Sequence, residues 1–242
     1  MLTLILLYPV FYILLSREKW FGHVFKLKKI WAKMILYNVG IRCKVLSAPL
    51  LKSDQPYIIC PNHASFLDIV TTYIVIPNYF HFMGKAELKK VPLFNKFFEN
   101  MNILVDRSSI IGSHKAFMRA GSDIDKGISI AIFPEATIPA CAPILGRYKN
   151  GAFKLAIDKQ IPIVPVVYLD NWRILPDGVR RKTGGMPGVS RVVIHDPIPT
   201  KGLNDSDLDH LKKKVHEVIQ NTLNEYGCCQ ELHKKEKPVT SS

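Results

Sequence analysis

Apolar residues dominate the chain as far as residue 15 and then recur at helical spacing as far as residue 37. The segment 2–15 contains almost no polar side chain, and charged residues follow it at once. As a helix it would be about 21 Å long, too short to cross a bilayer alone. In the segment 20–37, the apolar stripe is Trp20, Val24, Leu27, Trp31 and Met34, and the lysines that lie mostly on other faces are Lys26, Lys28, Lys29 and Lys33.

Residues 1–37 are therefore predicted to form a membrane-associated helical pair, in which an apolar anchor precedes a basic helix lying in the membrane interface. Four lysines beside two tryptophans are costly to bury. Two core helices of a soluble domain remain the alternative. A cleavable secretory signal is not expected, because no positive charge precedes the apolar run and no small-residue cleavage site follows it.

Beyond residue 40, short apolar runs alternate with helical patterns, which is typical of a β-sheet covered by helices. We predict strands at 57–60, 80–83, 103–105, 128–133, 163–168 and 191–195, and helices at 66–76, 93–100, 112–126, 152–159 and 206–226. The stretch 171–189 is rich in Gly, Pro and Arg and is predicted to be irregular. The expected fold class is α/β, with a mixed central sheet flanked by helices. One domain is expected at 38–227, followed by a loose tail at 228–242.

Composition and charge narrow the class of protein. With 48% hydrophobic and 22% charged residues, the chain is neither a disordered tail nor a fibre. Its net charge of +13 favours an anionic partner. No nucleic acid is expected, because no RNA-binding or helix-turn-helix signature appears and much of the lysine excess lies beside the N-terminal apolar run. The five cysteines contain no CxxC pair, which favours reduced thiols facing the cytoplasm.

Residues suited to proton transfer gather where the first predicted strand ends, at 60–68. Ser65 and Asp68 have the spacing of a capping box, which predicts a helix with Ser65 as its N-cap. His63 lies just before this cap and can fold back, so that Asp68 accepts a hydrogen bond from one ring nitrogen. The other ring nitrogen would then be free to act as a base.

Other interpretations of this segment stay open. Asp68 can act only as a cap that complements the helix dipole. A metal site of His63, Asp68 and His81 lacks a dense ligand cluster, so no metal and no cofactor is expected. Cys60 is expected to be a buried thiol, and Ser65 lacks the surroundings of a nucleophilic serine. The favoured chemistry is a base that acts on a substrate hydroxyl without a covalent enzyme intermediate.

Four blocks of this sequence resemble the glycerolipid acyltransferases typified by bacterial 1-acyl-glycerol-3-phosphate (lysophosphatidic acid) acyltransferases. They are residues 62–68 (NHASFLD); residues 84–88 (GKAEL) with 91–94 (VPLF) and 105–107 (VDR); residues 133–137 (FPEAT); and residues 161–166 (IPIVPV). The segment 148–153 (YKNGAF) is similar to the one that follows the third block. In the family the third block usually reads Phe-Pro-Glu-Gly-Thr-Arg, so Ala136 and Ile138 depart from it, and Asn95 stands where Gly is usual.

The resemblance implies an acyltransferase domain that moves a fatty acyl group from an acyl thioester to the free hydroxyl of 1-acyl-glycerol-3-phosphate, giving phosphatidic acid. It assigns His63 as the general base and Asp68 as its orienter. The substrate-binding residues that we infer with it are Lys85, Arg107, Glu135, Thr137, Arg147 and Lys149. The donor would be acyl-CoA or acyl carrier protein, and backbone N–H groups at the start of the following helix are candidates to hold the oxyanion.

The resemblance also implies a location at an anionic membrane surface, on the cytoplasmic face of the cell inner membrane. Two alternative functions remain. One is acyl transfer to another lysolipid, such as a lyso-ornithine lipid or a lysophospholipid with a larger head group, because Ile138 replaces a forked donor suited to phosphate. The other is a non-enzymatic, basic membrane-binding protein. In that case Lys85 and Arg107 are ordinary surface charges and Glu135 is a structural cap.

Overall fold

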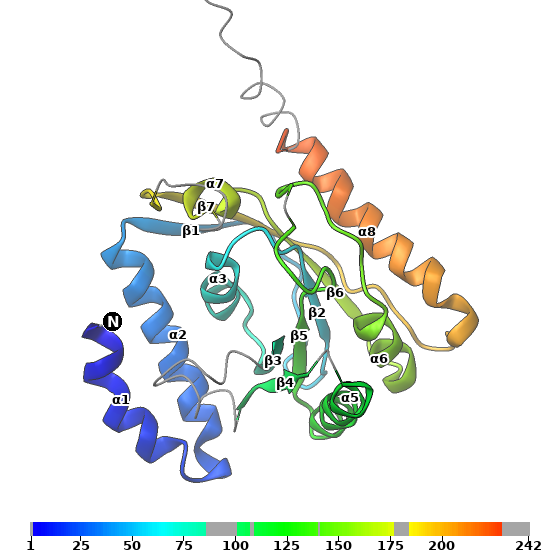
Figure 1. Ribbon diagram of the computed structural model, residues 1–242, viewed down its shortest axis with the longest axis horizontal. Helices are drawn as coiled ribbons and strands as arrows, with labels where there is room; N and C mark the ends of the chain where they lie inside the picture. The colour runs from blue at the N-terminus through cyan, green and yellow to red at the C-terminus, as the bar shows by residue number, and fades with distance from the viewer. Residues whose placement is uncertain (1, 86–100, 107–108, 140, 177–183, 229–242) are drawn as a thin grey trace, which may run out of the picture.

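The computed structural model describes residues 2–85, 101–106, 109–139, 141–176 and 184–228. These residues form a seven-stranded sheet with helices on both faces (Figure 1). The strands are β1 (Ile41–Ser47), β2 (Ile58–Pro61), β3 (Phe80–Lys85), β4 (Ile103–Val105), β5 (Ser129–Ile132), β6 (Ile163–Tyr168) and β7 (Gly188–Ile194). The helices are α1 (Leu2–Leu14), α2 (Phe21–Asn38), α3 (Leu67–Val75), α5 (Ile110–Asp125), α6 (Gly151–Lys159), α7 (Asn171–Ile174) and α8 (Leu208–Glu225).

The direction of the strands decides where a site can form. The sheet order is β1-β7-β6-β2-β5-β3-β4, and every neighbouring pair is parallel except β6 and β7. The carboxyl ends of β2 to β6 therefore share one edge of the sheet with the amino ends of β1 and β7. Loops that leave this edge bring distant parts of the chain together. The mixed sheet predicted from the sequence is confirmed.

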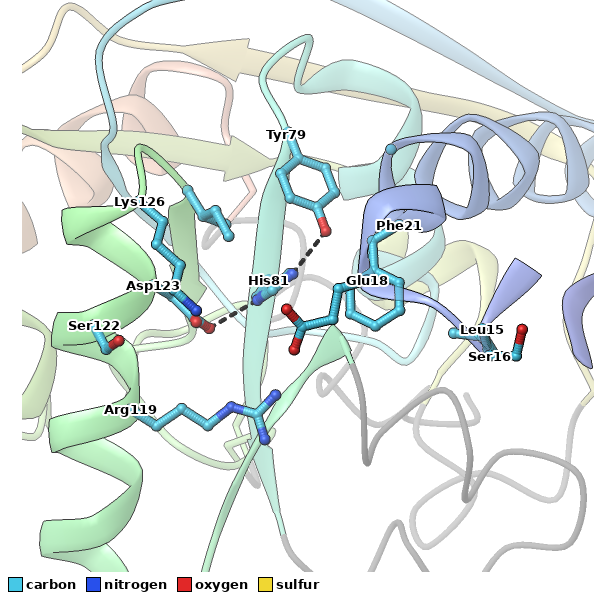
Figure 2. Close-up of a pocket in the computed structure, with 12 residues that line it drawn as sticks. Leu15, Ser16, Glu18, Phe21, Tyr79, His81, Arg119, Ser122, Asp123 and Lys126 are labelled. Carbon is cyan, nitrogen blue, oxygen red and sulfur yellow. Dashed lines mark hydrogen bonds and ion pairs between the residues drawn. The ribbon is translucent and has the colours of Figure 1, made fainter. Parts of the chain in front are cut away.

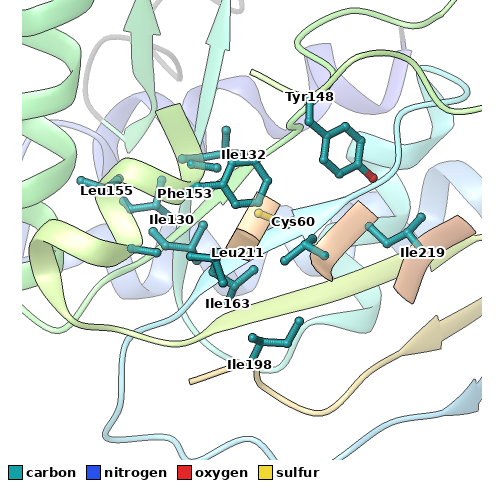
Figure 3. Packing of buried hydrophobic residues seen from close by; sticks show 14 of the residues in the cluster. Cys60, Ile130, Ile132, Tyr148, Phe153, Leu155, Ile163, Ile198, Leu211 and Ile219 are labelled. Atoms are coloured by element: carbon teal, nitrogen blue, oxygen red, sulfur yellow. The ribbon is translucent and has the colours of Figure 1, made fainter. Parts of the chain in front are cut away.

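Two hydrophobic clusters cover the two faces of the sheet. The strands β2, β5 and β6 are buried along their whole length, as parallel strands with both faces covered are. Helices α5, α6 and α8 cover one face, and α8 places Leu211, Val215 and Ile219 against it (Figure 3). The other face lies under α1, α2 and α3.

Helix α2 packs on the domain through a face that overlaps the predicted stripe only in part. Val24 is buried, and Leu27 and Trp31 are partly buried against the second cluster, whereas Met34 is exposed. The buried residues of α2 are Val24, Phe25, Lys28, Ala32 and Leu36. The Phe25 ring packs edge-on against Phe80 with centroids 5.1 Å apart. Lys28 faces the domain, and burial lowers the pKa of its amine to about 7. The Lys29 ammonium donates to the carbonyl oxygen of Ile76 at 2.7 Å. Two of the four lysines therefore contact the domain instead of pointing away from it.

Among the described residues, no helix is long and apolar enough to span a membrane. Six predicted strands and most of the predicted helices are observed, with bounds that differ by up to three residues. The predicted helix 93–100 lies outside the described residues. Strand β1 and the short helix α7 were not predicted. Cys228 is buried in the first cluster, and the rest of the predicted tail is not described.

The turn after β5 places Ala136 in a left-handed backbone conformation, with φ at +65°. This is the position where the resembled family usually has glycine. Alanine in this region costs about 1 kcal/mol or more relative to a relaxed backbone, whereas glycine adopts it freely.

We expect Ala136→Gly to raise the melting temperature by about 2–4 °C, which corresponds to about 1 kcal/mol in a domain of this size. The matched control is Ala156→Gly in the buried middle of α6, which should lower the melting temperature because glycine weakens a helix. Thermal unfolding followed by circular dichroism measures both. A loss of stability in Ala136→Gly would show that the left-handed turn is not strained.

Candidate active site

His63 and Asp68 lie at the carboxyl edge of the sheet, His63 in the loop that joins β2 to α3 and Asp68 in the first turn of α3. The ring nitrogen Nδ1 of His63 is 3.0 Å from Oδ2 of Asp68. The same oxygen accepts the backbone N–H groups of Ala64 at 2.7 Å and Ser65 at 2.9 Å. The Asp68 side chain is completely buried, whereas 11% of the His63 side chain is exposed. The predicted fold-back of His63 onto Asp68 is therefore observed, and only the histidine can be reached from solvent.

The start of α3 differs in detail from the predicted capping box. The helix begins at Leu67 with Phe66 at its N-cap position. The Ser65 hydroxyl accepts the N–H of Leu67 at 3.0 Å and donates to the carbonyl oxygen of Leu175 at 2.6 Å. The N–H groups of Ala64, Ser65 and Leu67 therefore bind side chains of this same segment.

The His63 ring packs with its flat side against a neighbouring aromatic ring. It stacks on Phe133 with centroids 4.0 Å apart and an angle of 19° between the planes. Phe133 comes from the end of β5, the strand next to β2. Among the residues that the structure describes, Nε2 of His63 has no hydrogen-bond partner. The ring is thus fixed with one nitrogen on Asp68 and the other available.

Glu135 ties the loop after β5 to the loop that carries His63. Its Oε1 accepts the N–H of His63 at 2.8 Å, and its Oε2 accepts the N–H of Gly146 at 2.7 Å. Burial raises the pKa of this carboxyl to about 7, and the two backbone hydrogen bonds partly oppose that shift. Both carboxylate oxygens accept backbone N–H groups, as in the alternative in which Glu135 is a structural cap.

The structure describes the positions of most of the other residues assigned to substrate binding. Arg147 directly follows Gly146, and its side chain is exposed, as are those of Thr137 and Lys149. The backbone N–H of Lys149 donates to the carbonyl oxygen of Pro134 at 2.8 Å, which closes this loop near the site. Lys85 ends β3 at the same edge, opposite Val105. Arg107 lies outside the described residues.

Three residues in contact with the site were not identified from the sequence. The Asn62 amide continues the pairing of β2 with β6, because it donates to the Tyr168 carbonyl oxygen and accepts the Tyr168 N–H. Asn171, at the start of α7, donates to Oδ1 of Asp68 at 2.8 Å. Ser190 in β7 donates to Asn171 at 2.6 Å. Asn171 fell in the segment 171–189, which was predicted to be irregular, and Ser190 lies between that segment and the predicted strand 191–195, so no periodicity identified either residue.

His81 does not join His63 in a metal site. Its Nδ1 is 2.8 Å from Asp123 of α5, and its Nε2 is 2.9 Å from the Tyr79 hydroxyl (Figure 2). These residues line a separate pocket of about 710 Å³ that also contacts the turn after α1. No group of three or more potential metal ligands is found in the described part of the chain. Cys60 is fully buried, and burial raises the pKa of its thiol, as expected of a core cysteine.

Comparisons with known proteins agree with this arrangement. Residues 42–169 match the sequence model of a family described as Acyltransferase. Human 1-acyl-sn-glycerol-3-phosphate acyltransferase alpha is 28% identical over 207 residues, which cover 83% of this chain and 70% of the relative. The chloroplastic 1-acyl-sn-glycerol-3-phosphate acyltransferase BAT2 of Brassica napus is 30% identical over 192 residues, 78% of this chain and 54% of the relative.

A solved structure has the same fold. The crystal structure of the 1-acyl-sn-glycerophosphate (LPA) acyltransferase PlsC from Thermotoga maritima superposes with a TM-score of 0.73 at 22% identity, covering 91% of this chain and 95% of that one. The family match spans more than half of the chain, from β1 to the end of β6, and includes both His63 and Asp68. The chain therefore belongs to the acyltransferase family.

Proposed function

We propose that this acyltransferase moves a fatty acyl group from an acyl thioester to the free hydroxyl of 1-acyl-glycerol-3-phosphate, giving phosphatidic acid, with His63 as general base and Asp68 as its orienter. The observation that carries the proposal is the 3.0 Å contact of Nδ1 of His63 with the buried Asp68 carboxylate. It leaves Nε2 without a partner among the described residues, and 11% of the His63 side chain is exposed. The names of the human and Brassica relatives support the choice of acceptor.

The proposed reaction needs one proton carrier and no covalent enzyme intermediate. Nε2 of His63 takes the proton from the acceptor hydroxyl as its oxygen attacks the thioester carbonyl carbon. The buried Asp68 carboxylate stabilises the imidazolium that forms. The tetrahedral intermediate then collapses, the carbon–sulfur bond breaks, and the departing sulfur takes the proton from His63. The products are an ester and a free thiol, from either CoA or acyl carrier protein.

The acceptor phosphate is proposed to lie against basic residues at the same edge of the sheet. Glu135 links the backbone of His63 to the loop that carries Arg147 and Lys149. Both of these side chains are exposed, so they are available to an anionic head group. Arg107, shortly after β4, and Lys85 at the end of β3 complete the proposed set. Ile138, which stands where the family usually has Arg, is half-buried and offers no donor to a phosphate. A lysolipid without a phosphomonoester is therefore the competing acceptor.

The protein is further proposed to act on lipid at the cytoplasmic face of the inner membrane, with α1 and α2 in one leaflet. The outward sides of these helices carry exposed apolar side chains, namely Val10, Tyr12, Ile13, Ile30, Met34 and Tyr37. Lipid would cover this surface, and basic side chains such as the exposed Lys26 and Lys33 would meet anionic head groups.

The reaction is tested by thiol release. Purified protein should release free thiol from acyl-CoA or acyl carrier protein only when lysophosphatidic acid is present. His63→Ala should lower kcat by about 100-fold or more, as loss of a general base does. Asp68→Asn should lower kcat by a comparable factor. Four donors surround the Asp68 side chain, and the NH2 group of the new amide would face at least one of them without an acceptor between them.

The matched control is His210→Ala, an exposed histidine of α8 that should leave kcat unchanged. Circular dichroism checks that each variant is folded. Near-normal turnover in His63→Ala would refute the base assignment. Thiol release that depends on another lysolipid and not on lysophosphatidic acid would show that this other lysolipid is the acceptor. If no lysolipid accepts an acyl group, the alternative of a non-enzymatic membrane-binding protein is supported.

Arg107→Ala tests recognition of the acceptor phosphate. The loss of a charge-assisted hydrogen bond to phosphate costs about 1.5–3 kcal/mol, so kcat/KM for lysophosphatidic acid should fall roughly 10-fold to 150-fold, mainly through KM. Lys201→Ala, an exposed lysine in the turn before α8, is the control. Unchanged kinetics with lysophosphatidic acid in Arg107→Ala would favour an acceptor without that phosphate.

Membrane binding is tested with substitutions on the outward apolar surface. Deletion of residues 1–37 is unsuitable, because it would uncover the core that Val24 and Phe25 protect. The double variant Ile13→Asp/Ile30→Asp should instead remain folded and move from the pellet to the supernatant when sedimented with anionic vesicles. Met118→Asp, an equally exposed apolar residue on α5, should still sediment.

Wild-type protein should stay bound in high salt, because apolar burial is not screened. Sedimentation of the double variant at the wild-type level would contradict the proposed leaflet contact.

A further inference from the structure

We infer that Asn171 is a positioning residue for the acyl-transfer dyad: its amide, held in place by Ser190, keeps the Asp68 carboxylate turned toward His63. The inference rests on the proposed role of Asp68 as the orienter of His63. It assigns a function to a residue of the short helix α7 that is more than one hundred positions from Asp68 in the chain.

The Asn171 side chain lies fully buried between Asp68 and Ser190. Its Nδ2 donates to Oδ1 of Asp68 at 2.8 Å. Its Oδ1 accepts the Ser190 hydroxyl at 2.6 Å. A carboxylate can only accept hydrogen bonds, so the nitrogen must face Asp68. The Ser190 hydroxyl donates to the opposite end of the amide, which fixes its orientation.

This contact completes the environment of a carboxylate that has no access to water. Oδ2 of Asp68 is shared by His63 and by two backbone N–H groups. Asn171 donates a hydrogen bond to Oδ1, the other oxygen. Without it, a buried anionic oxygen would lack this partner, and the carboxylate could rotate about its last bond to satisfy both oxygens with the same donors. Rotation would lengthen the contact with Nδ1 of His63.

The backbone around Asn171 is anchored from the neighbouring strand. The preceding residue, Asp170, is buried, and its Oδ2 accepts both the N–H and the Nε–H of Arg191 in β7, at 3.0 and 2.8 Å. Oδ1 of Asp170 accepts Nη2 of Arg191 at 2.8 Å. Asn171 therefore projects from a rigid junction between β6 and β7, as a positioning group requires.

The Ser190 backbone is in turn held by the edge strand. Ser190 lies opposite Cys43 of β1 in the parallel pairing of β7 with β1. Burial raises the pKa of the Cys43 thiol to about 11, so the thiol stays protonated at neutral pH. The side-chain donors therefore run from Ser190 through Asn171 to Asp68.

A comparison with Asn62 separates positioning from ordinary structural support. Asn62 is equally buried, but among the described residues its amide pairs with the backbone of Tyr168 alone and continues the sheet. In the same part of the chain, the Asn171 amide pairs with side chains, namely those of Asp68, Ser190 and Thr71. Loss of the Asn171 amide should therefore change the position of the Asp68 carboxylate and, as a consequence, lower kcat.

Asn171→Ala is expected to lower kcat by about 10-fold to 100-fold while KM for both substrates stays within about twofold, since the side chain is fully buried and acts through Asp68. The deciding comparison is a double-mutant cycle. In the Asp68→Asn background, Asn171→Ala should cause little further loss, about twofold or less, because its effect acts through the ionised carboxylate. Thr200→Ala, which removes a buried hydroxyl bonded to two backbone carbonyls, should lower stability without lowering kcat.

Ser190→Ala provides an independent variant that leaves the amide in place. It should lower kcat by about 3-fold to 10-fold, because the amide loses the donor that fixes its orientation. If Asn171→Ala does not fold, this variant decides the question. A kcat within twofold of wild type in folded Asn171→Ala, or in Ser190→Ala when the first variant is unfolded, overturns the inference. So does an equal loss in the wild-type and Asp68→Asn backgrounds.

These outcomes are separate from those that test the proposed function. If His63→Ala and Asp68→Asn remain active, the dyad mechanism itself fails. If both lose turnover and Asn171→Ala does not, only the inference about Asn171 fails.

Discussion

The site depends on one buried carboxylate. Asp68 has no exposed surface, and its two oxygens accept hydrogen bonds from His63, two backbone N–H groups and Asn171. Burying a charge of this kind is very costly unless hydrogen bonds replace its water. Those donors come from the loop after β2 and from α7, so the carboxylate can be stable only when β2 and β6 are already paired. The geometry of the base is thereby coupled to the fold of the sheet.

The mixed sheet makes this arrangement possible. Its parallel strands bring the loops after β2, β5 and β6 to one edge, and the antiparallel pairing of β6 with β7 brings Ser190 to the same edge. Phe133 supports the histidine ring from β5, while Glu135 holds its backbone and the following loop. Helices α1 and α2 complete the hydrophobic core on one face of this sheet and present apolar side chains on their outer side.

Local patterns predicted the parts of this structure that depend on local interactions. The buried strands are nearly continuous apolar runs, and the five-residue separation of His63 and Asp68 allowed their contact to be anticipated. Strand β1 was missed because it is an edge strand whose alternation of buried and exposed residues is short: it runs from Ile41 to Lys44 and is broken at Val45, where the register of its pairing shifts. The role of Asn171 was missed for a different reason. It depends on a partner more than one hundred residues away, and nothing in its own Gly-, Pro- and Arg-rich surroundings indicates that partner. Likewise, the spacing could not reveal that Glu135 binds two backbone groups.

The central claim is that Asp68 holds the proton of neutral His63 on Nδ1, so that Nε2 is free to accept one from the acceptor. Nitrogen-15 NMR of histidine-labelled protein tests this most directly, with the His63 signals assigned by their loss in His63→Ala. The account predicts a protonated Nδ1 and an unprotonated Nε2 in the neutral ring, and a weakened preference in Asp68→Asn. A neutral His63 with its proton on Nε2 in the wild type would contradict it.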